Sequence, residues 1–119
     1  MSTPNAHDDC PVAETFEILA SKWKSPIIYH LTQGTKRFGE LRRLIPEVTQ
    51  KMLTQQLRSL ERDGIVQRVQ YPEIPPRVEY SLTEIGESLH TVYGELVDWL
   101  NVHRTAIDAA RRRYDKKNR

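Results

Sequence analysis

Cysteine is nearly absent from this chain of 119 residues, and long apolar stretches are absent altogether. The single cysteine, Cys10, excludes a disulfide within the chain and fits a reducing compartment, although it leaves open a bond between two copies. No apolar run approaches the ~18 residues that a membrane-spanning helix needs, and the polar, acidic N-terminus lacks the apolar core of a secretion signal. These absences predict a cytoplasmic protein without membrane contact.

The residue types that most catalytic sites use are present in this sequence, but they are not arranged in any known catalytic pattern. The five glycines form no phosphate-binding loop, and no histidine is placed dependably beside the lone cysteine to activate it. The four histidines fall in separate segments without the spacing of metal ligands, namely His7, His30, His90 and His103. We therefore expect no catalytic site, no metal and no cofactor, which leaves a binding function.

Basic side chains are unevenly distributed along a chain whose net charge is only +2. Residues 1–20 carry four acids and no Lys or Arg, whereas residues 36–70 carry eight basic groups against four acidic ones. A second basic region lies at 104–119, and it fits either a solvated helix end or an auxiliary phosphate contact. The length predicts one domain, at residues 10–113, between a polar tail at 1–9 and a basic tail at 114–119.

Two short helices are predicted before the basic block. Proline at the first position of a helix needs no hydrogen-bond donor, so the first helix is expected to start at Pro11 and to run to Lys22 or Trp23. The pair Ser25 and Pro26 repeats this signal and predicts a second helix capped by Ser25, with Gly34 ending it.

A helix-turn-helix is predicted inside the basic block. Apolar spacing indicates a helix over residues 38–45, Pro46 closes it, and Thr49 caps a longer helix over residues 49–63. Leu53, Leu57 and Leu60 form the inward stripe of the longer helix. Its outward face carries amide, hydroxyl and cationic groups and no acid, which suits base edges and phosphates in a major groove; the residues are Gln50, Lys51, Thr54, Gln55 and Arg58. Such a face also occurs on ordinary solvated helices. Arg42 and Arg43 are placed where the bracing helix would cross the phosphates.

After Gly64 the apolar period changes from 3.6 to 2, which predicts two strands at 65–71 and 78–82. Three prolines within residues 72–76 make the connecting loop stiff and withhold amides from a sheet neighbour, as suits a projecting wing. Arg77 at the base of this wing is a candidate for phosphate or minor-groove contact. The fold class expected is mainly α with a small β-hairpin, a winged helix-turn-helix.

A long final helix is predicted from a cap at Thr83 to about Arg113. Its apolar stripe has little intramolecular core left to cover, so we expect it to form a homodimer with the same stripe of a second copy. The alternative is that it folds back over its own core. The expected interface residues are Phe16 from the first helix and Leu89, Val92, Leu96, Trp99 and Leu100 from the last.

Seven sequence blocks together resemble the HxlR-type helix-turn-helix family of bacterial transcription regulators. They occur in order with that family's spacings, and the resemblance spans residues 10 to about 100, whereas the basic tail after His103 is less typical. The blocks are residues 10–12 (Cys-Pro-Val), 22–24 (Lys-Trp-Lys), 37–41 (Arg-Phe-x-Glu-Leu), 50–57 (Gln-Lys-Met-Leu-Thr-Gln-Gln-Leu), 60–64 (Leu-Glu-x-Asp-Gly), 71–80 (Tyr-Pro-Glu-x-Pro-Pro-Arg-Val-Glu-Tyr) and 82–86 (Leu-Thr-Glu-x-Gly).

The resemblance implies a homodimeric, sequence-specific regulator that binds double-stranded operator DNA, here expected to be a repressor. It also implies that Cys10 is a candidate sensor of oxidants or electrophiles, so that the inducer would be a reactive electrophile. The residues themselves leave this open, because a helix N-terminus favours the thiolate of Cys10 while Asp8 and Asp9 oppose it by a similar amount. Two alternatives are a regulator controlled by a non-covalent small ligand and a winged helix that contacts only proteins.

Overall fold

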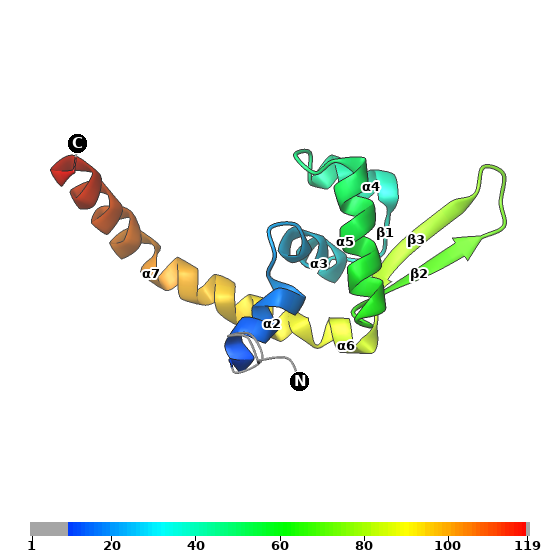
Figure 1. The fold of residues 1–119 in the computed structure, drawn as a ribbon, viewed down its shortest axis with the longest axis horizontal. Coiled ribbons are helices and arrows are strands. Elements are labelled where there is room, and N and C mark those ends of the chain that lie inside the picture. The colour runs from blue at the N-terminus through cyan, green and yellow to red at the C-terminus, as the bar shows by residue number, and fades with distance from the viewer. Residues whose placement is uncertain (1–9, 119) are drawn as a thin grey trace, which may run out of the picture. The chain divides into compact units, whose positions relative to one another are not determined.

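The computed structural model describes residues 10–118, in the order shown in Figure 1. The chain divides into two compact units, one up to Glu87 and one from Ser88 onward. Residues 1–9, for which the sequence predicts a tail, lie outside the described residues, and the predicted domain limits at 10 and 113 stay a prediction. The elements are α2 (Pro11–Leu19), α3 (Lys24–Thr32), β1 (Lys36–Arg37), α4 (Phe38–Leu44), α5 (Gln50–Arg62), β2 (Val66–Tyr71), β3 (Arg77–Leu82), α6 (Glu84–Glu87) and α7 (Leu89–Lys117).

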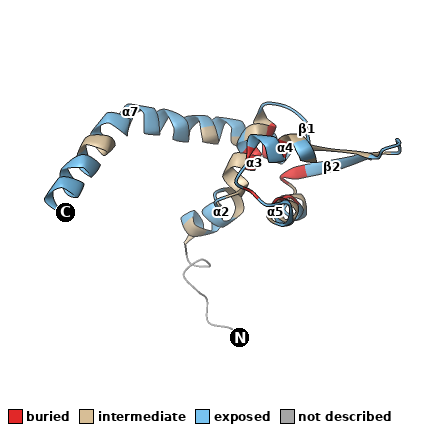
Figure 2. Cartoon of the chain, turned by 90° about the horizontal axis from the view of Figure 1, so that it is seen from above, coloured by how far each residue is buried: buried red, intermediate tan, exposed pale blue. Residues whose placement is uncertain are grey.

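The core of the first unit is aliphatic and is built where three helices meet the base of the sheet. Figure 2 shows the buried segments gathered on α3, α4, α5 and the start of β2. Because these side chains recur at helical or strand spacing, each element turns one face inward and leaves the other in water. The buried side chains are Ile27, Ile28, Leu31, Leu41, Ile45, Val48, Leu53, Leu57, Leu60, Ile65, Val66 and Leu82.

The start of α3 differs from the sequence prediction, which placed Ser25 as the cap. The helix begins two residues earlier than predicted, at Lys24 instead of Pro26, and the Lys24 backbone N–H donates to the Ser21 hydroxyl at 3.2 Å. Ser25 lies inside the first turn, where its hydroxyl donates to the Leu19 carbonyl at 3.2 Å. Pro26 is tolerated because amides of the first turn have no partner within the helix. The preceding helix, α2, ends at Leu19 rather than at Lys22 or Trp23.

The hairpin belongs to a sheet of three strands, whereas the sequence predicted two. Strands β2 and β3 pair antiparallel from Val66 opposite Leu82 to Tyr71 opposite Arg77, as their alternation predicted. The short strand β1 pairs with the other edge of β3, giving the order β1-β3-β2. Two residues carry no periodic signal, so β1 could not be predicted. It ties the residue before α4 to the hairpin, while the outer part of the hairpin projects beyond the helices (Figure 1).

The predicted final helix is interrupted, and its first turn is the separate helix α6. The Thr83 hydroxyl accepts from the Gly86 N–H at 3.1 Å, which confirms the predicted cap, and the Thr83 N–H donates to the Ile65 carbonyl at 3.0 Å. A turn at Ser88 follows Gly86, a residue that favours helix weakly. In the second unit, α7 runs to Lys117, beyond the predicted end at Arg113. No helix in residues 10–118 is long and apolar enough to cross a membrane.

Gly86 allows α6 to lie directly against the sheet, and its substitution should destabilise the fold. A Cβ at this position would approach the Ile65 carbonyl oxygen to 2.3 Å and Leu82 to 3.1 Å. We expect Gly86→Ala to cost roughly 1–3 kcal/mol of unfolding free energy, measured by chemical denaturation. The matched control is Gly39→Ala in α4, where a Cβ meets only the end of Arg43 at 3.7 Å and should stabilise the helix by roughly 0.5–1 kcal/mol. Equal stability of both variants would contradict this packing.

Candidate DNA-binding surface

The orientation of α5 is fixed by its cap and by its inward leucines. The Met52 N–H donates to the Thr49 hydroxyl at 3.0 Å, as the sequence predicted for the start of this helix. Leu53, Leu57 and Leu60 are fully or almost fully buried. Gly64, with φ of 74°, ends the helix in the left-handed conformation that glycine favours. Since these contacts hold one face against the core, the opposite face is presented to solvent in a defined orientation.

The outward face of α5 contains the five residues that the sequence singled out, and together they line a shallow surface hollow. Four of them are exposed: Gln50, Lys51, Gln55 and Arg58. Their side chains form no ion pair and no hydrogen bond within residues 10–118. Thr54 differs, because it is half-buried and its hydroxyl donates to the Gln50 carbonyl at 2.9 Å. Its oxygen remains an acceptor, but its hydrogen is committed within the helix.

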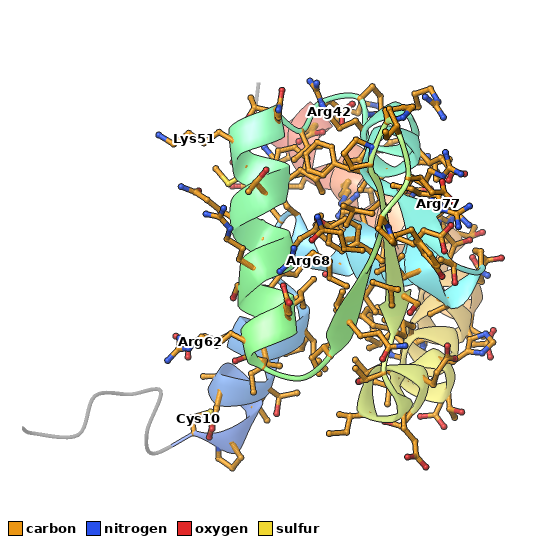
Figure 3. All side chains as sticks on the ribbon, turned by 90° about the vertical axis from the view of Figure 1, so that its right-hand side faces the viewer. Cys10, Arg42, Lys51, Arg62, Arg68 and Arg77 are labelled. Atoms are coloured by element: carbon orange, nitrogen blue, oxygen red, sulfur yellow. The ribbon has the colours of Figure 1, made fainter. Side chains whose placement is uncertain are left out.

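Arg42 and Arg43 extend from the last turn of the bracing helix α4, where both are exposed. The turn between α4 and α5 is held by Ile45 and Val48, which are almost fully buried and joined by a backbone hydrogen bond of 3.1 Å. Figure 3 shows Arg42 at the same end of the unit as Lys51 on α5. The turn therefore places cations from two helices at one end of the surface.

Arg77 is held inside the wing more firmly than the sequence suggested. Its guanidinium lies 4.1 Å from the ring centroid of Tyr71, with ion pairs to Glu73 at 3.2 Å and to Glu79 at 3.6 Å. Its side chain is only 28% exposed. Two carboxylates offset its charge, which leaves Arg77 less positive potential for a phosphate than the unpaired cations of α5 have. Contact between Arg77 and DNA stays a prediction.

Sequence reasoning missed a pocket between α5 and the hairpin, of about 160 Å³. Arg68 on β2 stands directly opposite Tyr80 on β3, so their side chains share one face of the sheet. The Arg68 Nε atom lies 3.5 Å from a carboxylate oxygen of Glu61 on α5. Figure 3 shows Arg68 between α5 and the strands, whereas Lys51 and Arg62 point away from the hairpin. The pocket is lined by Thr54, Leu57, Arg58, Glu61, Arg68 and Tyr80.

The charges around this pocket act on Tyr80 in opposing directions. Burial raises the pKa of Tyr80 most, Glu61 raises it further, and Arg68 and Arg58 lower it. Because the balance is a raised pKa, the hydroxyl stays protonated at neutral pH and is available as a donor. The period-2 pattern placed Arg68 on a strand, but only the register shows that it faces Tyr80 and α5.

Cys10 is a half-buried free thiol at the residue that precedes α2. Its carbonyl accepts from the Glu14 N–H at 3.1 Å, but its side chain makes no capping hydrogen bond to the helix. The position at a helix N-terminus is the one that the sequence predicted. Asp8 and Asp9, expected to oppose the thiolate, lie outside the described residues. Within residues 10–118, no group of His, Cys, Asp and Glu is arranged to hold a metal ion.

The second unit presents a long apolar stripe to solvent. Figure 2 shows α7 as almost entirely exposed. Leu96 is 49% and Trp99 is 58% exposed, although leucine and tryptophan are usually covered. The other residues predicted for the interface are exposed or half-buried, namely Phe16 on α2 and Leu89, Val92 and Leu100 on α7.

A winged helix-turn-helix is the arrangement that the sequence resemblance predicted, and none of the five residues lining the hollow on α5 is acidic. The model of the HxlR-like helix-turn-helix family matches residues 18–108. The chain belongs to this family. Among relatives of this HxlR-like protein, the uncharacterized HTH-type transcriptional regulator YdeP of Bacillus subtilis (strain 168) is 49% identical over 112 residues, which cover 92% of this chain and 88% of YdeP.

Solved structures agree with this assignment. The redox regulator HypR in its reduced form is 45% identical with a TM-score of 0.79, covering 84% of this chain and 99% of HypR. Diamide-treated YodB from B. subtilis is 42% identical with a TM-score of 0.67, covering 77% of this chain and 92% of YodB. This HxlR-like protein is therefore a transcriptional regulator with a winged helix-turn-helix, and the predicted fold class is confirmed.

Proposed function

We propose that the protein is a sequence-specific DNA-binding repressor that acts as a homodimer, with α5 in the major groove, and that it is not an enzyme. The observation that carries the proposal is the outward face of α5, where Gln50, Lys51, Gln55 and Arg58 are exposed and unpaired within the described residues. Amide and guanidinium groups match the edges of adenine and guanine, and lysine matches phosphates. A surface for protein contact is typically rich in aromatic side chains, and none of the five residues that line this hollow is aromatic.

The α5 face should divide into base-reading and phosphate-binding residues. Using a duplex selected from a random pool, we expect Gln55→Ala or Arg58→Ala to weaken binding by ~1–3 kcal/mol each if they reach base edges. Lys51→Ala should weaken all sequences alike and reduce the salt dependence. Arg62→Ala is the matched control, because Arg62 is also exposed on α5 but lies at the opposite end of the helix from Lys51 (Figure 3) and does not line the hollow. Unchanged affinity of all three variants would sink the assignment.

The apolar stripe of α7 supports the dimer. A second copy that covers the exposed side chains of Leu96 and Trp99 would remove apolar surface from water at about 25 cal/mol per Å². Two copies related by a twofold axis present two reading helices to DNA. Half-sites should therefore be roughly palindromic and about one helical turn apart, ~34–36 Å.

A charge within the stripe should separate the copies. We expect Leu96→Asp to sediment as a monomer at micromolar concentration and to bind the selected duplex poorly, because a carboxylate cannot be buried there unpaired. Asn101→Asp is the control, since Asn101 is exposed and lies on the opposite side of α7 from Leu96 and Leu100 by helical spacing. A parent protein that is itself monomeric under these conditions would reject the dimer.

Cys10 is the proposed sensor, with a reactive oxidant or electrophile as the inducer. Support comes from its position at the start of α2 and from the similarity to HypR, a redox regulator. Backbone amides at a helix start favour a thiolate, and modification of a half-buried thiol changes how α2 packs. A change in α2 packing would then alter the separation of the two reading helices.

Diamide or a quinone should weaken DNA binding by the parent protein and leave Cys10→Ser unaffected. Serine keeps the size and the helix start but cannot form the thiolate that reacts. Binding is measured by fluorescence anisotropy before and after treatment, and reducing agent should restore the diamide-treated parent. Equal responses of parent and serine variant, or no response in either, would exclude Cys10 as the switch.

A further inference from the structure

The pocket between α5 and the hairpin adjoins the proposed reading face. Thr54 and Arg58 line both the open hollow on α5 and this pocket, so the two depressions are neighbours on α5. The opposite wall is formed by Arg68 and Tyr80 from the two strands of the wing. The site therefore lies where the reading helix and the wing come together.

The pocket offers more donors than its own residues use. Two guanidinium groups, of Arg58 and Arg68, face one carboxylate, of Glu61, so the net charge is positive. Glu61 lies 3.5 Å from Arg68 Nε without a hydrogen bond between the two side chains, and no other ion pair of Arg68 and none of Arg58 occurs within residues 10–118. The planar guanidinium has several N–H groups that suit an oxyanion. The N–H groups of Arg68 are therefore left for another acceptor.

We propose that this pocket holds a backbone phosphate of the bound DNA, contacted by Arg68 and the Tyr80 hydroxyl from the wing, beside Arg58, which reaches the base edges from α5. The inference rests on the proposed function, because it requires α5 to enter the major groove. The sugar-phosphate strand that borders the major groove then passes between α5 and the wing. A phosphate in the pocket would fix the register of the helix on the duplex.

A small phosphate ion free in solution is the other ligand with the same chemistry, and the pocket suits it less well than a DNA phosphate. Arg68 is 45% exposed, so water competes for its donors and a single free phosphate gains little from them. A phosphate carried by a duplex that α5 already binds arrives at high effective concentration.

The test compares Arg68→Gln with Arg62→Gln on the selected duplex between 50 and 200 mM salt. Arg68→Gln removes one phosphate contact per half-site and therefore two per dimer, which lowers the salt slope by about 1.8, so the parent should lose about twelvefold more affinity than Arg68→Gln over this range. Arg62→Gln should keep the parent slope. Arg68→Gln also leaves the Glu61 carboxylate without its cation. The double variant Glu61→Gln with Arg68→Gln removes this carboxylate as well and should show the same reduced slope, because the slope depends on the lost cation.

Tyr80→Phe should weaken binding severalfold without changing the slope, because it removes a neutral donor.

A neutral methylphosphonate placed at each backbone position in turn identifies the phosphate. At one position per half-site the substitution should weaken the parent severalfold and leave Arg68→Gln unaffected, because the two changes remove the same contact. If the parent binds the duplex while Arg68→Gln and Arg62→Gln behave alike, the pocket assignment is overturned and the proposed function stands. If the parent binds no duplex, both fail. Saturable binding of inorganic phosphate at low millimolar concentration without DNA, lost in Arg68→Gln, would assign the site to a free anion instead.

Discussion

Burial of the leucine stripe of α5 is the interaction on which the rest of the first unit depends. Leu53, Leu57 and Leu60 pack into the aliphatic core that α3, α4 and the base of the sheet enclose. Each leucine contributes about 1.5–3 kcal/mol relative to exposure, which is a large share of the stability of a small domain. Any rotation of α5 would expose this stripe, so the polar residues on its other side are held in one orientation.

Acidic neighbours distinguish the cations around the proposed DNA-binding surface. On the hairpin side, Glu61 lies beside Arg68, and within the wing Glu73 and Glu79 pair with Arg77. The cations on the outward face of α5 and at the end of α4 have no such partners within the described residues. These unpaired charges supply most of the positive potential that a DNA backbone seeks, and Arg68 adds to it because its N–H groups form no hydrogen bond with Glu61. The sum of charges over the chain, only +2, conceals this division.

Features with a local physical signal were predictable from the sequence. The cap at Thr49, the left-handed end of α5 at Gly64 and the alternation of the two wing strands all follow from nearby residues. Features that depend on distant residues were not. Strand β1 exists because β3 offers it a free edge, and α3 starts after Trp23 rather than after Ser25 because the chain turns earlier, where the Ser21 hydroxyl accepts from the Lys24 N–H. The pocket of Arg68 and Tyr80 depends on how the hairpin lies against α5, which no periodicity encodes.

The central claim is that α5 reads the major groove, and replacing guanine N7 in the selected duplex tests it most directly. A 7-deazaguanine lacks this acceptor but keeps the Watson–Crick pairing and the minor groove intact. The account predicts that such substitution at a few positions per half-site weakens binding by ~1–3 kcal/mol, and that Arg58→Ala abolishes this sensitivity at one of them. Full affinity for a duplex substituted at every guanine, together with sensitivity to changes in the minor groove, would contradict it.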